Sequence, residues 1–229
     1  GFGAYGFPES HSASFALLAY ASAWLKCHHP AAFYCGLLNS QPMGFYAPSQ
    51  LIQDARRHNI DVRPICINHS KWDHTLEGEP ASPALRLGLR LVKGFSQHSA
   101  DQLCQARQKA LFHSIDDFCS RLNMAKQYWQ QLVQADAFHC FDLHRHQSLW
   151  EISAWQATTP LGDLQPAHSD NIQLPAPLET EEVLSDYRHT GLSLRRHPAA
   201  LLRTHKAFKN CVPADQLKHI DDGRFIRLY

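Results

Sequence analysis

The first six residues, GFGAYG, place glycines at positions 1, 3 and 6, a spacing that could form a phosphate-cradling turn. In dinucleotide-binding folds such a turn follows a strand, opens into a helix and has an acidic residue about 20 positions further on. Here Pro8 interrupts the pattern, and no Asp or Glu occurs between Glu9 and Asp54. We therefore expect no dinucleotide site in this segment.

A second candidate for phosphate chemistry is the turn KGFS at residues 93–96, followed by apolar helical positions at Ala100 and Leu103. It resembles a helix-hairpin-helix unit, with Ser96 where a second glycine is usual. Such a turn presents backbone N–H groups at a helix N-terminus, where they hold a phosphate oxygen without reading bases. An ordinary helix-turn-helix corner with Ser96 as the cap explains the same pattern equally well. The predicted DNA contacts here are Lys93, Gly94, Phe95, Ser96, His98 and Arg107.

Residues 114–150 show a similar pattern of helices and a turn. The turn matches the motif less well, because ADAF at 135–138 stands where a glycine is expected. Two such units in tandem commonly grip both strands of a duplex across the minor groove, which favours DNA binding. Lys126 and Arg145 are the predicted DNA contacts of this second unit.

The cluster HCFDLHRH at 139–146 has zinc-ligand residue types, but its spacings do not match the usual Cys/His pairs. The sequence also lacks a phosphate loop with GK[ST], HExxH, GxSxG and an Asp-x-Asp pair for two metal ions. We therefore predict no metal site and no catalytic residue in this chain.

Composition indicates a folded protein, with 44% hydrophobic and 19% charged residues and no apolar run long enough for a membrane span. Seven widely spaced cysteines without a CxxC motif favour reduced thiols and a cytoplasmic location. The net charge is +1, but acidic and basic residues are separated along the chain. Residues 151–186 contain seven acidic residues and no Lys or Arg, and residues 187–210 contain six Lys or Arg and no acidic residue. Such blocks are usually solvated, but a basic block can also follow a phosphate backbone.

Helical periodicity predicts three helices near the start of the chain. The first, over 12–28, is apolar nearly all round and is expected to be buried on most sides. Pro30 and Pro48 should begin helices over 31–39 and 49–58, and Asn59 can end the last in a left-handed conformation.

Further along, two or three short strands are expected from residue 60, with helices over 89–150 and a Pro-rich linker beyond. A helix should start at Thr180 and stop at Gly191, and Pro198 should begin a basic helix over AALLRTHKAF.

The stretch from Gly6 to Tyr46 resembles the closing helices of the fingers domain in the bacterial DNA polymerase III alpha-subunit family. Replicative members typically show GF-N-K-S-H-S where this sequence has GFPESHS at 6–12, and the Pro-Glu form resembles the error-prone, ImuC-type branch. LIQDARRHNIDVRP, INHSKWDHTLE, VKGF, TGLSLRRHP and GRFIRLY continue the resemblance in order along nearly the whole chain.

The resemblance implies a mainly α fold in five parts. These are the end of the polymerase fingers (1–62), a short β hairpin with a tandem helix-hairpin-helix region (63–150), an acidic Pro-rich linker (151–186), a basic helical connector (187–215) and the first strand of an OB-type barrel (216–229). The family's fingers close over the incoming nucleotide, which makes Ser10, His11 and Phe15 candidate nucleotide-binding residues. Core packing is the alternative role for His11 and Phe15.

The whole protein implied by the resemblance is an error-prone DNA-directed DNA polymerase that acts in translesion synthesis and damage-induced mutagenesis. Its implied partners are primer-template DNA, deoxynucleoside triphosphates, a sliding clamp and an ImuB-type protein. Its Mg²⁺ would be held by palm aspartates outside this chain, so we expect no bound cofactor here. A stand-alone helix-hairpin-helix module without catalysis, and a scaffold that meets an acidic partner through the basic helix, are the alternatives.

Overall fold

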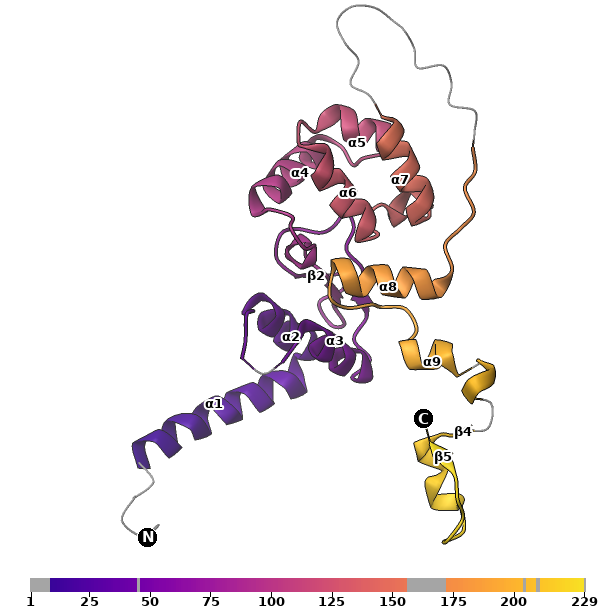
Figure 1. The fold of residues 1–229 in the computed structure, drawn as a ribbon. Coiled ribbons are helices and arrows are strands. Elements are labelled where there is room, and N and C mark those ends of the chain that lie inside the picture. Colours follow the sequence, from indigo (N-terminus) through magenta and orange to yellow (C-terminus); the bar gives the residue numbers. More distant parts are fainter. Residues whose placement is uncertain (1–8, 45, 156–171, 204, 209–210, 229) are drawn as a thin grey trace, which may run out of the picture.

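The structure, a computed structural model, describes residues 9–44, 46–155, 172–203, 205–208 and 211–228 (Figure 1). The glycines at 1, 3 and 6 lie outside these residues. The described chain is mainly helical with short strands, as predicted. No helix in this part of the chain is both long enough and apolar enough to cross a membrane.

Three helices, α1 (Glu9–His28), α2 (Pro30–Asn39) and α3 (Pro48–Arg57), form the first unit. Pro30 and Pro48 occupy first helical positions, where a missing N–H costs nothing. Asn59 ends α3 in a left-handed conformation, with φ of 59°. These three predictions from sequence are confirmed.

The predicted burial of α1 is wrong for the described chain. Phe15, Leu17 and Tyr20 are 55%, 73% and 72% exposed. The helix projects away from α2 and α3, and its last turns lie closest to them (Figure 1). Most of its apolar surface therefore finds no cover among the described residues, although the pattern itself is that of a buried helix.

A three-stranded sheet follows, in the order β1 (Val62–Arg63), β3 (Ala84–Arg86), β2 (Thr75–Glu77). β3 pairs parallel with β1 and antiparallel with β2, and Gly78 with φ of 89° lies in the turn between β2 and β3. The guanidinium of Arg86 donates to both oxygens of Glu77 across this pair. The predicted short hairpin is thus present.

The central helical region packs around an aromatic core. Phe118 contacts Phe112 and Phe138 edge to face, with ring centroids 5.1 and 4.9 Å apart, and Trp129 contacts Trp155 in the same way at 5.1 Å. The elements are the 3-10 turn η2 (Leu89–Leu91), α4 (Gln97–Lys109), α5 (Ile115–Arg121), α6 (Lys126–Gln134), the 3-10 turn η3 (His139–Phe141) and α7 (Arg145–Ala154).

Helix α8 (Glu179–His189) lies against this region, and Gly191 follows it with φ of 82°, close to the predicted stop. The predicted boundary between residues 186 and 187 therefore falls inside a helix. The last elements are α9 (Pro198–Leu202), η4 (Lys206–Phe208), β4 (Cys211–Val212), η5 (Ala214–His219) and β5 (Arg227–Leu228).

The single basic helix predicted from Pro198 is wrong, because α9 has only five residues and the chain turns before η4. Three of the predicted helix's ten residues after Pro198 are Arg, His or Lys and four are Ala or Thr, so little apolar surface is available to extend it. β5 pairs parallel with β4 over two residues. The OB-type barrel stays a prediction.

Candidate nucleic-acid interface

The first hairpin turn joins η2 to α4 and requires glycine at position 94. Gly94 has φ of 80°, and a Cβ atom there would lie 2.8 Å from Nε2 of Gln131 in α6. A side chain would thus meet both backbone strain and a neighbouring helix. The tight turn that the KGFS pattern predicts is present, and it packs directly on the second helical unit.

Ser96 is the N-cap of α4, and its Oγ accepts from the backbone N–H of Ser99 at 3.1 Å. The capping role considered for this serine is therefore observed. Phe95 is buried and contacts the Tyr128 ring edge to face. His98 in the first turn of α4 is exposed.

Lys93 connects the first hairpin to α8. Its ammonium donates to the carbonyls of Arg188 at 2.8 Å and Tyr187 at 3.3 Å, and its backbone N–H donates to the carbonyl of His189 at 2.9 Å. These carbonyls lie in the last turn of a helix, where a cation is favoured. Lys93 thus caps α8 in this structure, and its phosphate contact stays a prediction.

The second unit replaces the glycine of its turn with an aspartate. Asp136, in the ADAF segment, has φ of 57°, a conformation that Asp tolerates better than most residues. Lys126 in α6 donates to the carbonyl of Ser153 at 2.7 Å, near the end of α7. Arg107 in α4 donates to the carbonyl of Ile67 at 2.8 Å. Both cations therefore also support the structure around them.

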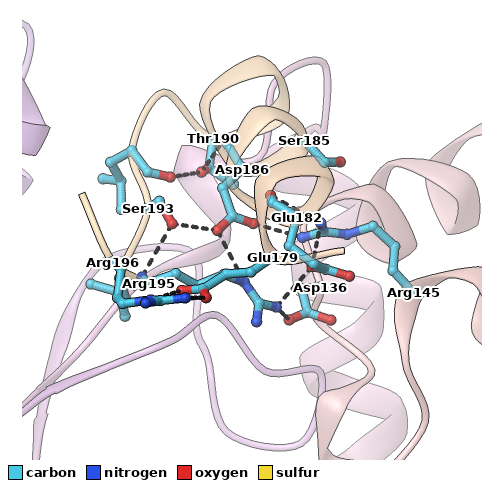
Figure 2. Close-up of polar contacts among 12 residues, drawn as sticks. Asp136, Arg145, Glu179, Glu182, Ser185, Asp186, Thr190, Ser193, Arg195 and Arg196 are labelled. Atoms are coloured by element: carbon cyan, nitrogen blue, oxygen red, sulfur yellow. Dashed lines mark hydrogen bonds and ion pairs between the residues drawn. The ribbon is translucent and has the colours of Figure 1, made fainter. Parts of the chain in front are cut away.

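Arg145 is the most buried of the predicted DNA contacts. Its side chain is 5% exposed and lies 2.6 Å from carboxylate oxygens of both Glu182 and Asp186 on α8 (Figure 2). A phosphate could reach Arg145 only if this arrangement opened. The residue holds α8 against the hairpin region, a role that sequence spacing alone does not reveal.

Arg195 completes this network from the opposite side. It donates to Asp136 at 2.7 Å and to Glu182 at 2.8 Å, so the acidic groups of α8 lie between two arginines (Figure 2). Burial raises the pKa of Glu182 and of Asp136, and the two arginines oppose that effect. The second hairpin turn and the segment after α8 are thereby held together.

The candidate nucleotide-binding residues lie on α1, apart from the hairpins. The His11 and Phe15 rings are 4.4 Å apart on one face, as expected for positions i and i+4. Both are exposed, so they are not part of the described core. Ser10 lies in the first turn of the same helix. The start of α1 lies apart from α4 to α7 in the fold (Figure 1).

Among the described residues, no group of three or more His, Cys, Asp or Glu side chains could hold a metal ion. The histidines of 139–146 have other partners. His144 caps α7 by accepting from the backbone N–H of Gln147 at 3.1 Å, and its Nε2 lies 2.9 Å from the carbonyl of Leu174.

Residues 59–148 match the family model described as a helix-hairpin-helix motif. The whole chain is similar to proteins named error-prone DNA polymerase. It is 50% identical to the one from Methylococcus capsulatus, 46% to that of Teredinibacter turnerae and 48% to that of an Azoarcus species, over all of this chain and 24%, 22% and 22% of theirs. The expected resemblance to the error-prone branch is therefore confirmed. The chain spans about a quarter of the length of these relatives.

Proposed function

We propose that this chain is part of an error-prone DNA-directed DNA polymerase and supplies the end of its fingers and a grip on duplex DNA. The observation that carries the proposal is similarity at 46–50% identity, over the whole chain, to proteins named for that activity. The helix-hairpin-helix match over residues 59–148 supports the duplex grip.

The similarity also favours a polymerase over a stand-alone DNA-binding module. It includes α1 to α3, which lie before the helix-hairpin-helix match and would have no purpose in a module that only binds duplex. On this proposal His11 and Phe15, exposed on one face of α1, lie near the incoming nucleotide, with Ser10 beside them.

We propose that the first hairpin contacts a phosphate through the turn at Gly94 and the flanking exposed His98. Lys93 and Lys126 add positive charge beside the two hairpins. The grip is sequence-independent because backbone amides and cations recognise phosphate rather than bases.

The remaining parts of the proposal rest on the resemblance. The intact protein would use Mg²⁺ held by residues outside this chain, take deoxynucleoside triphosphates, act in the cytoplasm and work with a sliding clamp and an ImuB-type partner. Translesion synthesis and damage-induced mutagenesis are the proposed roles.

Primer extension by the full-length protein tests the proposal. A labelled primer is extended on an undamaged template and on a matched template with one abasic site. The proposal predicts Mg²⁺-dependent extension on both, with frequent misinsertion. Duplex binding without any extension would instead support the stand-alone module.

A further inference from the structure

A basic groove lies between α3 and the segment that follows α8, outside both hairpins. It has a volume of about 480 Å³. Its lining includes the cationic residues Arg56, Arg57, Arg195, Arg196 and His197, and it includes no Asp or Glu. Two arginine pairs that are far apart in the sequence thus face one hollow.

The two sides of the groove are joined directly. Arg56 in α3 donates from Nη1 to the carbonyl of Leu194 at 2.9 Å, across 138 positions of sequence. This bond fixes the end of α3 against the segment that carries Arg195 and Arg196. The groove is therefore a feature of the fold rather than of one loop.

The arginines of the groove differ in whether their guanidinium groups already pair with carboxylates, and so in how freely they can bind an anion. Arg195 is paired with Asp136 and Glu182, and Arg196 with the carboxylate of Glu179. Among the described residues, Arg57 has no hydrogen-bond or ion-pair partner for its guanidinium, and it is exposed. Arg57 is thus the cation of the groove with the most free donor capacity.

A basic residue in the last turn of α3 is favoured by the dipole of that helix. The dipole does not explain why residues 195–197 place further basic side chains on the opposite side of the groove. A planar guanidinium binds a phosphate oxygen pair through two parallel N–H bonds. Tyr187, which also lines the groove, supplies a hydroxyl group that can donate to the same anion, whereas the hydroxyl of Ser193 already donates to Asp186 at 2.6 Å.

The groove also adjoins the first hairpin. Tyr187 lines it, and the backbone carbonyl of the same residue accepts from the ammonium of Lys93. A strand whose phosphates contact the hairpin turn therefore has the groove as its neighbouring basic surface.

We propose that this groove is a second phosphate site, in which Arg57 binds a phosphodiester of a DNA strand already held by the hairpins. The inference rests on the proposed duplex grip, but it does not depend on catalysis.

Duplex affinity of the full-length protein, followed by fluorescence anisotropy over a series of salt concentrations, tests the site. Arg57→Gln is compared with Lys71→Gln, which removes the same charge from an exposed position outside the groove. We expect Arg57→Gln to weaken binding about tenfold and to reduce the slope of log affinity against log salt by about 0.9, the contribution of one phosphate. Lys71→Gln should change neither quantity.

Gln53→Glu provides a second variant that leaves every arginine in place. Gln53 lines the groove one turn before Arg57, so the new carboxylate would pair with Arg57 and also support α3. We expect it to weaken duplex binding without lowering the melting temperature.

The inference is overturned if Arg57→Gln and Gln53→Glu bind duplex like Lys71→Gln. It is also overturned if only the KM for the nucleotide triphosphate rises, since the groove would then serve the triphosphate. A wild-type protein that binds duplex but extends no primer would remove the proposed function and leave the groove standing.

Discussion

At the scale of single residues, Gly94 shows why the hairpin motif needs a glycine at this position of the turn. The sequence pattern predicted a tight turn, and the turn has φ of 80° at this glycine. What the pattern could not supply was the neighbour, because Gln131 belongs to another helix 37 positions later. A local motif fixes the backbone, whereas its surroundings depend on how distant segments pack.

Gly94→Ala should lower the free energy of unfolding by about 1–3 kcal/mol, because alanine would be strained at this φ and its Cβ would press on Gln131. Chemical denaturation measures the change. The control is Gly36→Ala within α2, where a Cβ meets nothing within 4 Å and the substitution should stabilise the protein by up to about 1 kcal/mol. If both changes shifted stability in the same direction, the account of Gly94 would be wrong.

His74 gives the fold a specific pH dependence. It is 3% exposed, its Nδ1 accepts from the backbone N–H of Gly88 at 3.1 Å, and burial lowers its pKa to about 4. Its neutral form is favoured in the folded state, so this contribution to stability is complete above about pH 6.5.

As pH falls from about 6.5 to about 4, protonation of His74 is favoured in the unfolded state and should lower the free energy of unfolding by up to about 3 kcal/mol. The measurement is urea unfolding at several pH values for wild type and His74→Gln. The wild type should lose more stability than the variant across this window. His98→Gln, at an exposed position, should retain the wild-type profile. Parallel profiles for wild type and His74→Gln would contradict the assignment.

At the scale of elements, a polar cluster near the end of α1 joins this helix to α2 and α3. Lys26 donates to Asp54 of α3 at 2.8 Å, and the hydroxyl of the buried Tyr34 donates to the same carboxylate. Hydrogen bonds from Lys26 and Tyr34 lower the pKa of Asp54, and the bond to Asp54 raises the pKa of Lys26. This cluster sets the direction in which α1 leaves α2.

Lys26→Met should loosen the attachment of α1 while keeping the aliphatic part of the side chain. Backbone amides in the last turns of α1 are expected to exchange with deuterium several-fold faster, as read by mass spectrometry. Lys26→Arg retains the ion pair and should restore slow exchange. Equal protection in wild type and Lys26→Met would show that the cluster does not hold the helix.

The docking of α8 depends on the buried Arg145. Arg145→Met should cost about 3–5 kcal/mol of unfolding free energy, because it removes the buried cation beside Glu182 and Asp186 and leaves them only the more exposed Arg195. Arg196→Met removes an exposed pair with Glu179, which water screens, and should cost much less. Thermal or urea unfolding compares the two, and similar losses would refute a special role for Arg145.

Helix starts and ends that carry a local signal were the part of the fold that the sequence predicted best. Prolines at helix starts, Asn59 after α3 and Gly191 after α8 are local signals, and the structure has them where expected. The burial of α1 and the extent of the basic helix were wrong, because both depend on what packs against the helix. Sequence periodicity shows which face is apolar but not whether a partner covers it.

At the scale of the whole molecule, the segregated charges turn out to be partners. Glu179, Glu182 and Asp186 of the acidic block pair with Arg195 and Arg196 of the basic block and with Arg145. The sequence alone favours a solvated face for each block, with phosphate contact as the alternative for the basic block. Neither interpretation could include the pairing, because the chain must first bend back after α8.

This pairing places the first hairpin, α8 and the basic groove next to one another. Lys93 bonds to the end of α8, Arg145 and Arg195 hold its acidic face, and Arg56 bonds to the segment beyond. The predicted DNA contacts and the groove therefore form one connected part of the molecule. We propose that this part of the molecule holds duplex DNA by its phosphates.

Duplex binding at several salt concentrations is the most direct test of that claim. The affinity of the full-length protein is measured for two duplexes of equal length and unrelated sequence. We predict affinities that agree within about twofold and fall steeply with salt, with a log–log slope of about −0.9 for each phosphate contacted. A strong preference for one sequence, or an affinity that salt leaves unchanged, would contradict the claim.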